Sequence, residues 1–181
     1  MASGRLTGGG ITYWGNLIID WTSTANTAGN KSTVTATLKL AMQSGGTISV
    51  NARAGTTITI NGNTKTFTAP AVSKLNSSVV NITLGSHTVD VAHNENGSKS
   101  INIGGYYPIQ ATIGTYYSGF SVASTTVTLD RIYRNFYVRV GNGSNKPVIG
   151  EVYVGNSSNK PVKAQEVYVG NSSNKPVKAV Y

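Results

Sequence analysis

Apolar and polar residues alternate along most of the chain. Between positions 33 and 42 every second residue is apolar: Val34, Ala36, Leu38, Leu40 and Met42. The positions between them hold Thr33, Thr35, Thr37 and Lys39. Because successive side chains of a strand point to opposite faces, this segment predicts a half-buried strand with a threonine-rich exposed face. The same spacing places Leu17, Ile19 and Trp21 on one face of a second strand.

Two Asn-Gly pairs predict tight turns between strands. Asn61-Gly62 interrupts TTITINGNTKTF, and Asn96-Gly97 interrupts SHTVDVAHNENGSKSINI. Both residues of a two-residue hairpin turn need a positive φ, which Asn and Gly accept. We therefore expect a hairpin at each pair, the second one returning through Ile101 and Ile103. Roughly nine or ten short strands before residue 134, without any helical period, predict an all-β protein, an Ig-like or jelly-roll-like β-sandwich.

The pattern divides the chain into three parts. Residues 1–10, which include three consecutive glycines, are expected to form a flexible N-terminal lead-in. Residues 11–134 are expected to form the β-sandwich domain. Residues 135–181 form a separate repeat segment, because VRVGNGSNKP at 138–147 recurs as VYVGNSSNKP at 152–161 and 167–176.

Each repeat unit resembles a short strand, a turn and a return strand that begins at proline. The spacing between units is 14 and then 15 residues, with Gln165 as the extra residue. One interpretation is a short β-meander with strands near 136–140, 148–154, 162–169 and 177–181, and a bulge near Gln165. The other is a solenoid with one turn per unit. The short connections favour the meander.

A small sheet with one apolar face is stable only if another surface covers that face. The apolar residues of the repeats are therefore the candidate assembly interface: Val138, Val140, Val152, Tyr153, Val154, Val167, Tyr168 and Val169. We expect this interface to pack against a second copy of the chain or another protein of the same assembly. The alternative is that the repeats fold back onto their own sandwich.

Charge and composition restrict the partners. The net charge is +9, but the basic residues are dispersed, so a nucleic-acid partner is not expected. The repeat turns place Lys146, Lys160 and Lys175 at equivalent positions, where they either contact an anionic polymer or keep the turns soluble, and we favour the second role. The N-terminus lacks the apolar stretch of a signal peptide, and no run approaches the roughly 20 apolar residues of a membrane span. We expect a soluble protein without a membrane partner.

The sequence shows no local cluster of side chains that is typical of a catalytic site. His87 and His93 share one face of a predicted strand while Asp90 lies on the other, so no triad or carboxylate pair forms locally. The two histidines could share a metal with a third ligand, but partly buried strand histidines are the favoured interpretation. We expect no enzymatic activity, no cofactor and no metal.

Two tyrosine pairs are candidate contacts for a sugar or a protein partner. They are Tyr106-Tyr107 and Tyr116-Tyr117. Aromatic rings on loops can stack on sugars, just as they anchor other interfaces. The simpler expectation is that one ring of each pair packs inward.

The stretch from HTVDVAHNENGSKSINIGG to SVASTTVTLDRI resembles a domain of minor structural proteins of tailed phages from Gram-positive hosts. The matching residues are His93, Asn94, Gly97, Lys99, Ser100, Ile101, Ile103, Ile132 and Arg134. The resemblance covers roughly residues 10–134, and the tail resembles the Val-Tyr-Val-Gly…Pro-Val-Lys repeats that end many phage tail-associated proteins.

The resemblance implies a non-enzymatic virion protein, made in the host cytoplasm and acting through homo-oligomeric packing with other virion proteins. A position in the tail or tail tip is the main expectation. The alternatives are a head decoration or capsid spike protein, and a carbohydrate-binding module for host adsorption that contacts cell-surface polysaccharide.

Overall fold

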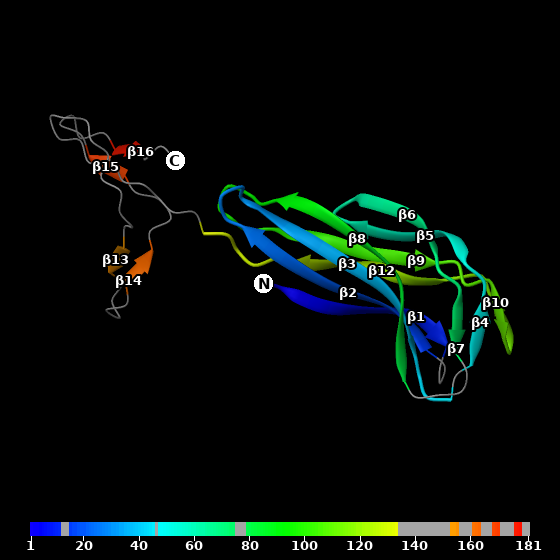
Figure 1. Cartoon of the computed structure of the whole chain (residues 1–181). Helices are drawn as coiled ribbons and strands as arrows, with labels where there is room; N and C mark the ends of the chain where they lie inside the picture. Colours follow the sequence, from blue (N-terminus) through cyan, green and yellow to red (C-terminus); the bar gives the residue numbers. More distant parts are fainter. Residues whose placement is uncertain are drawn as a thin grey trace. The chain divides into compact units, whose positions relative to one another are not determined.

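The computed structural model describes residues 1–11, 15–45, 47–74, 79–133, 153–155, 161–163, 168–170 and 176–178. All regular secondary structure in these ranges is β-strand. The chain divides into two compact units, residues 1–132 and residues 133–181 (Figure 1).

The first sheet of the N-terminal unit has four antiparallel strands in the order β1-β2-β3-β8. Its strands are β1 (Ser3–Ile11), β2 (Gly15–Asn26), β3 (Lys31–Met42) and β8 (Val80–Ala92). The apolar positions predicted for β3 are all fully buried, while the residues between them are partly exposed. The period-two pattern therefore correctly identified the inward face of this strand.

The second sheet also has four antiparallel strands, in the order β12-β9-β5-β6. Its strands are β5 (Arg53–Ile60), β6 (Asn63–Ala69), β9 (Ser100–Tyr107) and β12 (Phe120–Thr128). Two smaller antiparallel pairs complete the unit: β4 (Ile48–Val50) with β7 (Val72–Lys74), and β10 (Ala111–Ile113) with β11 (Thr115–Tyr117).

The core lies between the two four-stranded sheets, which Figure 1 shows as two layers. Fully buried side chains from both sheets meet there, among them Leu38 of β3 and Ile58 of β5. Burying a side chain of this size stabilises the fold by roughly 1.5–3 kcal/mol. The prediction of an all-β sandwich is confirmed, with eight main strands in two sheets.

The hairpin predicted at Asn61-Gly62 is present between β5 and β6. Asn61 has a φ of 48° and Gly62 a φ of 80°, and Ile60 pairs directly with Asn63. Both turn residues thus adopt the left-handed conformation that a tight hairpin turn requires.

The hairpin predicted at Asn96-Gly97 is wrong. The chain does turn there, because the amide of Asn94 donates to the carbonyl of Ser98 at 3.0 Å. However, β8 pairs with β3 in the first sheet, whereas β9 pairs with β5 and β12 in the second. Both strands bury apolar residues in the same core from opposite layers, so the turn connects the two sheets.

The prediction of a flexible lead-in over residues 1–10 is also wrong. Ser3–Ile11 is the edge strand β1, which pairs with β2 from Ser3↔Thr22 to Ile11↔Gly15. The register shifts between Thr7 and Gly10, within the glycine run. A Cβ atom on Gly8 would collide with the carbonyl oxygen of Ser121 in β12. The glycines therefore allow β1 to approach the backbone of the opposite sheet.

The C-terminal unit contains two hairpins with the same register. β13 (Tyr153–Gly155) pairs with β14 (Pro161–Lys163), and β15 (Tyr168–Gly170) pairs with β16 (Pro176–Lys178). Proline is accommodated at the start of each return strand, as expected. The first repeat unit and residues 164–167, which hold the expected bulge at Gln165, lie outside the described residues.

Candidate functional site

The structure separates the two rings of the first tyrosine pair. Tyr107 is fully buried, and its hydroxyl has no hydrogen-bond partner among the described residues. Burial raises the pKa of the Tyr107 phenol, while the positive charge of Arg53 acts in the opposite direction. Tyr106 points to the outer side of the same strand and is 37% exposed. Tyr107 therefore belongs to the core, and its candidacy as a ligand contact is wrong.

The second pair divides in the same way. Tyr117 is partly buried and packs against Phe120, with ring centroids 5.6 Å apart. Tyr116 is 62% exposed on the short β10–β11 hairpin. One ring of each pair thus packs inward, as expected, which leaves Tyr106 and Tyr116 as surface candidates.

Most candidate residues of the repeats lie outside the described residues, namely Val138, Val140, Val152, Val167, Lys146, Lys160 and Lys175. Tyr153 and Val154 lie in β13, and Tyr168 and Val169 occupy the equivalent positions in β15. The assembly interface and the lysine row therefore remain predictions.

The two histidines bind different partners. Nε2 of His87 lies 2.9 Å from Oδ1 of Asn63, which links the neighbouring edges of the two sheets. Nε2 of His93 lies 2.8 Å from Oγ of Ser32, and its Nδ1 lies 2.8 Å from the carbonyl oxygen of Gly97. Each ring is therefore engaged in a local structural contact.

Asn30 closes a buried polar cluster around His93. Its φ is 47°, and its side-chain amide donates to the carbonyls of His93 and Asn94 at 3.3 and 3.2 Å. The backbone amide of His93 donates in turn to the carbonyl of Asn30 at 2.9 Å. These bonds hold the start of β3 against the turn after β8.

The same turn holds the end of the sandwich. The amide of Ile132 donates to the carbonyl of Gly97, and Nε of Arg131 donates to the carbonyl of Asn96, both at 2.9 Å. The motif residues His93 and Gly97 thus form a corner that fixes the chain up to Ile132. Arg134, the last residue of the motif, lies outside the described residues.

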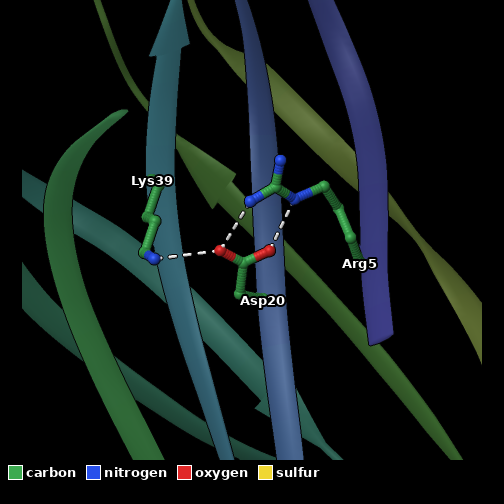
Figure 2. A network of polar contacts seen from close by, with 3 residues as sticks. All are labelled: Arg5, Asp20 and Lys39. Atoms are coloured by element: carbon green, nitrogen blue, oxygen red, sulfur yellow. Dashed lines mark hydrogen bonds and ion pairs between the residues drawn. The ribbon is translucent and has the colours of Figure 1, made fainter. Parts of the chain in front are cut away.

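An ion-pair network that the sequence analysis missed lies on the outer face of the first sheet. Figure 2 shows Asp20 of β2 between Arg5 of β1 and Lys39 of β3. Arg5 donates to both carboxylate oxygens at 2.6 and 2.9 Å, and Lys39 donates at 2.9 Å. Mainly through the Arg5 hydrogen bonds, the pKa of Asp20 falls to about 2.

A second ion pair on this face joins Lys31 and Asp90. The Lys31 ammonium lies 2.6 Å from the Asp90 carboxylate, which also accepts a hydrogen bond from Thr33. The hydrogen bond from Lys31 is the larger of the causes that lower the pKa of Asp90. Both carboxylates therefore stabilise strand pairing on a solvent-exposed surface.

Two further features of the described part of the chain bear on function. No three His, Cys, Asp or Glu residues within it lie close enough together to hold a metal ion. It also holds no helix long and apolar enough to span a membrane.

No protein-family model, curated protein or solved structure matches this chain.

Proposed function

We propose that this chain is a non-enzymatic structural protein of a tailed-phage particle, located in the tail or tail tip and acting through homo-oligomeric packing. The observation that carries the proposal is the pair of repeat hairpins with identical register, β13–β14 and β15–β16. Identical units offer identical contacts, which is what symmetric packing of many copies requires. The motif resemblance of the sandwich points to the same class of particle.

The construction of the sandwich supports a role in an assembled particle. The chain has no cysteine, so its stability outside a cell must come from packing and assembly. On one side of the sandwich, the edge strands β6 and β8 are partly blocked, because Nζ of Lys65 in β6 donates to the carbonyl of Ser86 in β8 at 2.9 Å. Blocked edges suppress uncontrolled strand pairing between copies, which leaves the repeats as the favoured site of controlled association.

The use of the ionisable groups supports a non-enzymatic role. Asp20 and Asp90 form ion pairs with basic side chains, and Asp130 lies 2.6 Å from the N-terminal ammonium. Both histidines are engaged in structural contacts. General acid–base chemistry needs groups that converge on a common point, whereas each of these groups contacts a different local partner.

Immunogold electron microscopy of particles from the producing strain tests the proposal. An antibody against the sandwich should label the tail or its tip. Label over the head would favour the decoration or spike alternative. Particles of normal morphology without any label, in a lysate that contains the chain, would refute a virion role.

A further inference from the structure

The two outer faces of the sandwich differ in charge. The first sheet carries the ion pairs Arg5–Asp20, Lys39–Asp20 and Lys31–Asp90. The outward positions that pair across the second sheet hold no charged residue; those with a side chain are Thr57, Thr59, Thr64, Thr66, Ser100, Asn102, Tyr106, Ser121, Thr126 and Thr128. A chain with a net charge of +9 thus presents one face without a charged side chain.

The side chains at the two ends of this face differ in their hydrogen bonds. At one end the side chains satisfy one another: Thr59 with Thr64 at 2.8 Å, Thr126 with Asn102 at 2.7 Å, and Ser100 with Thr128 at 3.2 Å. At the other end lie four hydroxyls that have no side-chain hydrogen bond to any described residue: Thr57, Thr66, Tyr106 and Ser121. The free hydroxyls therefore gather around the single aromatic ring of the face.

Strand register fixes the arrangement of this group, which we call the Tyr106 surface. Tyr106 of β9 pairs directly with Thr57 of β5 on one side and with Ser121 of β12 on the other. Thr57 pairs in turn with Thr66 of β6. The four side chains consequently form one row across the second sheet.

The ring of Tyr106 is held in place from one side. It lies against the backbone of Gly119, where a Cβ atom would collide with the ring and its hydroxyl. The ring nevertheless stays 37% exposed. A tyrosine restrained in this way provides apolar contact area and a hydroxyl at a low entropic cost of ordering.

We propose that the Tyr106 surface binds a neutral polysaccharide of the bacterial cell surface, an inference that rests on the proposed virion function for the source of the sugar. The apolar face of a hexose packs on an aromatic ring, and its hydroxyls exchange hydrogen bonds with Thr57, Thr66 and Ser121. Recognition of phosphate or carboxylate groups relies on charge-assisted hydrogen bonds. The uncharged row therefore favours a neutral polymer over an anionic one.

Sedimentation of the full chain with cell walls tests this assignment. The probe is protease-treated wall from the bacterium in which the chain is made. Wild type should bind it, and Tyr106→Ala should weaken binding about tenfold or more, the effect of truncating a central aromatic contact. Thr66→Lys, an exposed change on an edge strand, should also weaken binding. Thr128→Ala on the same face and Tyr116→Ala off it are the matched controls and should bind normally.

Chemical treatment of the cell walls shows whether the chain recognises sugar hydroxyls or charged groups. Periodate oxidation, which cleaves vicinal diols of sugars, should abolish binding, whereas 0.5 M salt should leave it unchanged because no charge is involved. Loss of binding at high salt, equal losses in Tyr116→Ala, or no wall binding by wild type would overturn the assignment. Altered self-association of folded Tyr106→Ala in light scattering, with normal wall binding, would instead identify an interface between copies.

The two proposals fail separately. Tyr106→Ala should enter particles as wild type does, because the Tyr106 surface is not the assembly interface. Wall binding without incorporation into particles would remove the virion role and keep the sugar site. Incorporation into particles without wall binding would remove the sugar site and keep the virion role.

Discussion

Nδ1 of His93 donates a hydrogen bond to the carbonyl oxygen of Gly97, 2.8 Å away. A carbonyl oxygen can only accept, so Nδ1 carries the hydrogen of this bond, while Nε2 lies 2.8 Å from the hydroxyl oxygen of Ser32. The same carbonyl of Gly97 accepts the amide of Ile132. One histidine thus joins the start of β3, the turn between the sheets and the last residue of the sandwich.

Replacing His93 should therefore destabilise the sandwich. In His93→Ala the hydroxyl of Ser32, which is 1% exposed, loses its partner, and the free energy of unfolding should fall by about 1–3 kcal/mol. His87→Ala is the matched control, because its contact with Asn63 is exposed, and it should cost less than about 0.5 kcal/mol. Urea denaturation followed by tryptophan fluorescence measures both. Equal effects would contradict the structural role given to His93.

Alternation of apolar residues was sufficient to predict the buried faces. Val34 and Leu40 of β3 are fully buried, as the spacing indicates. Alternation also implies that neighbouring rings such as Tyr106 and Tyr107 point to opposite sides. Local pattern succeeds here because successive side chains of a strand point to opposite faces.

Pairing between distant strands could not be predicted in the same way. Asn61-Gly62 and Asn96-Gly97 look alike locally, yet only the first makes a hairpin, because β8 and β9 find their partners in different sheets. Asp20 meets Arg5 and Lys39 across 15 and 19 residues of sequence. Such contacts depend on strand order and register, and turn residues alone do not determine them.

Asp20 should make stability depend on pH in the acid range. Its pKa falls from 3.8 in the unfolded chain to about 2 in the folded protein, so its stabilising effect is complete above about pH 5. The effect should be lost as the pH falls from about 4 through 2. After allowance for solvent screening we expect about 1 kcal/mol. Denaturation curves of wild type and Asp20→Asn should differ at pH 6 and converge near pH 2.

A constant difference between the two proteins across this range would contradict the assigned titration. Asp90→Asn provides a comparison. The pKa of Asp90 is also lowered, chiefly by the hydrogen bond from Lys31, but the group is more exposed. Asp90→Asn should therefore change the pH dependence of the free energy of unfolding less than Asp20→Asn does.

Two adjacent glycines test the approach of β1 to the second sheet. A Cβ atom on Gly8 would collide with the carbonyl of Ser121, whereas a Cβ on Gly9 would lie 3.7 Å from the same oxygen. Gly8→Ala should therefore lower the free energy of unfolding by about 1–3 kcal/mol, and Gly9→Ala should change it little. Thermal melts of both variants provide the measurement, and a Gly9→Ala loss as large as that of Gly8→Ala would refute this packing.

Deletion of residues 136–181 tests whether the first unit folds alone and whether the repeats mediate assembly. Because residues 1–132 form a compact unit with its own core, the truncated chain should keep a β-type circular dichroism spectrum and a cooperative melt. It should be monomeric and absent from particles, since the candidate assembly interface has been removed. Normal incorporation of the truncated chain would show that the repeats are an exposed appendage.

If this chain is a structural component of a virion, it must remain with the particles throughout purification. Quantitative mass spectrometry of particles purified through successive density gradients measures this. We predict that the chain follows the particles at a constant ratio to the major tail protein, in a number consistent with a symmetric ring. A ratio that falls with each gradient, or recovery of the chain only in the soluble fraction, would contradict the account.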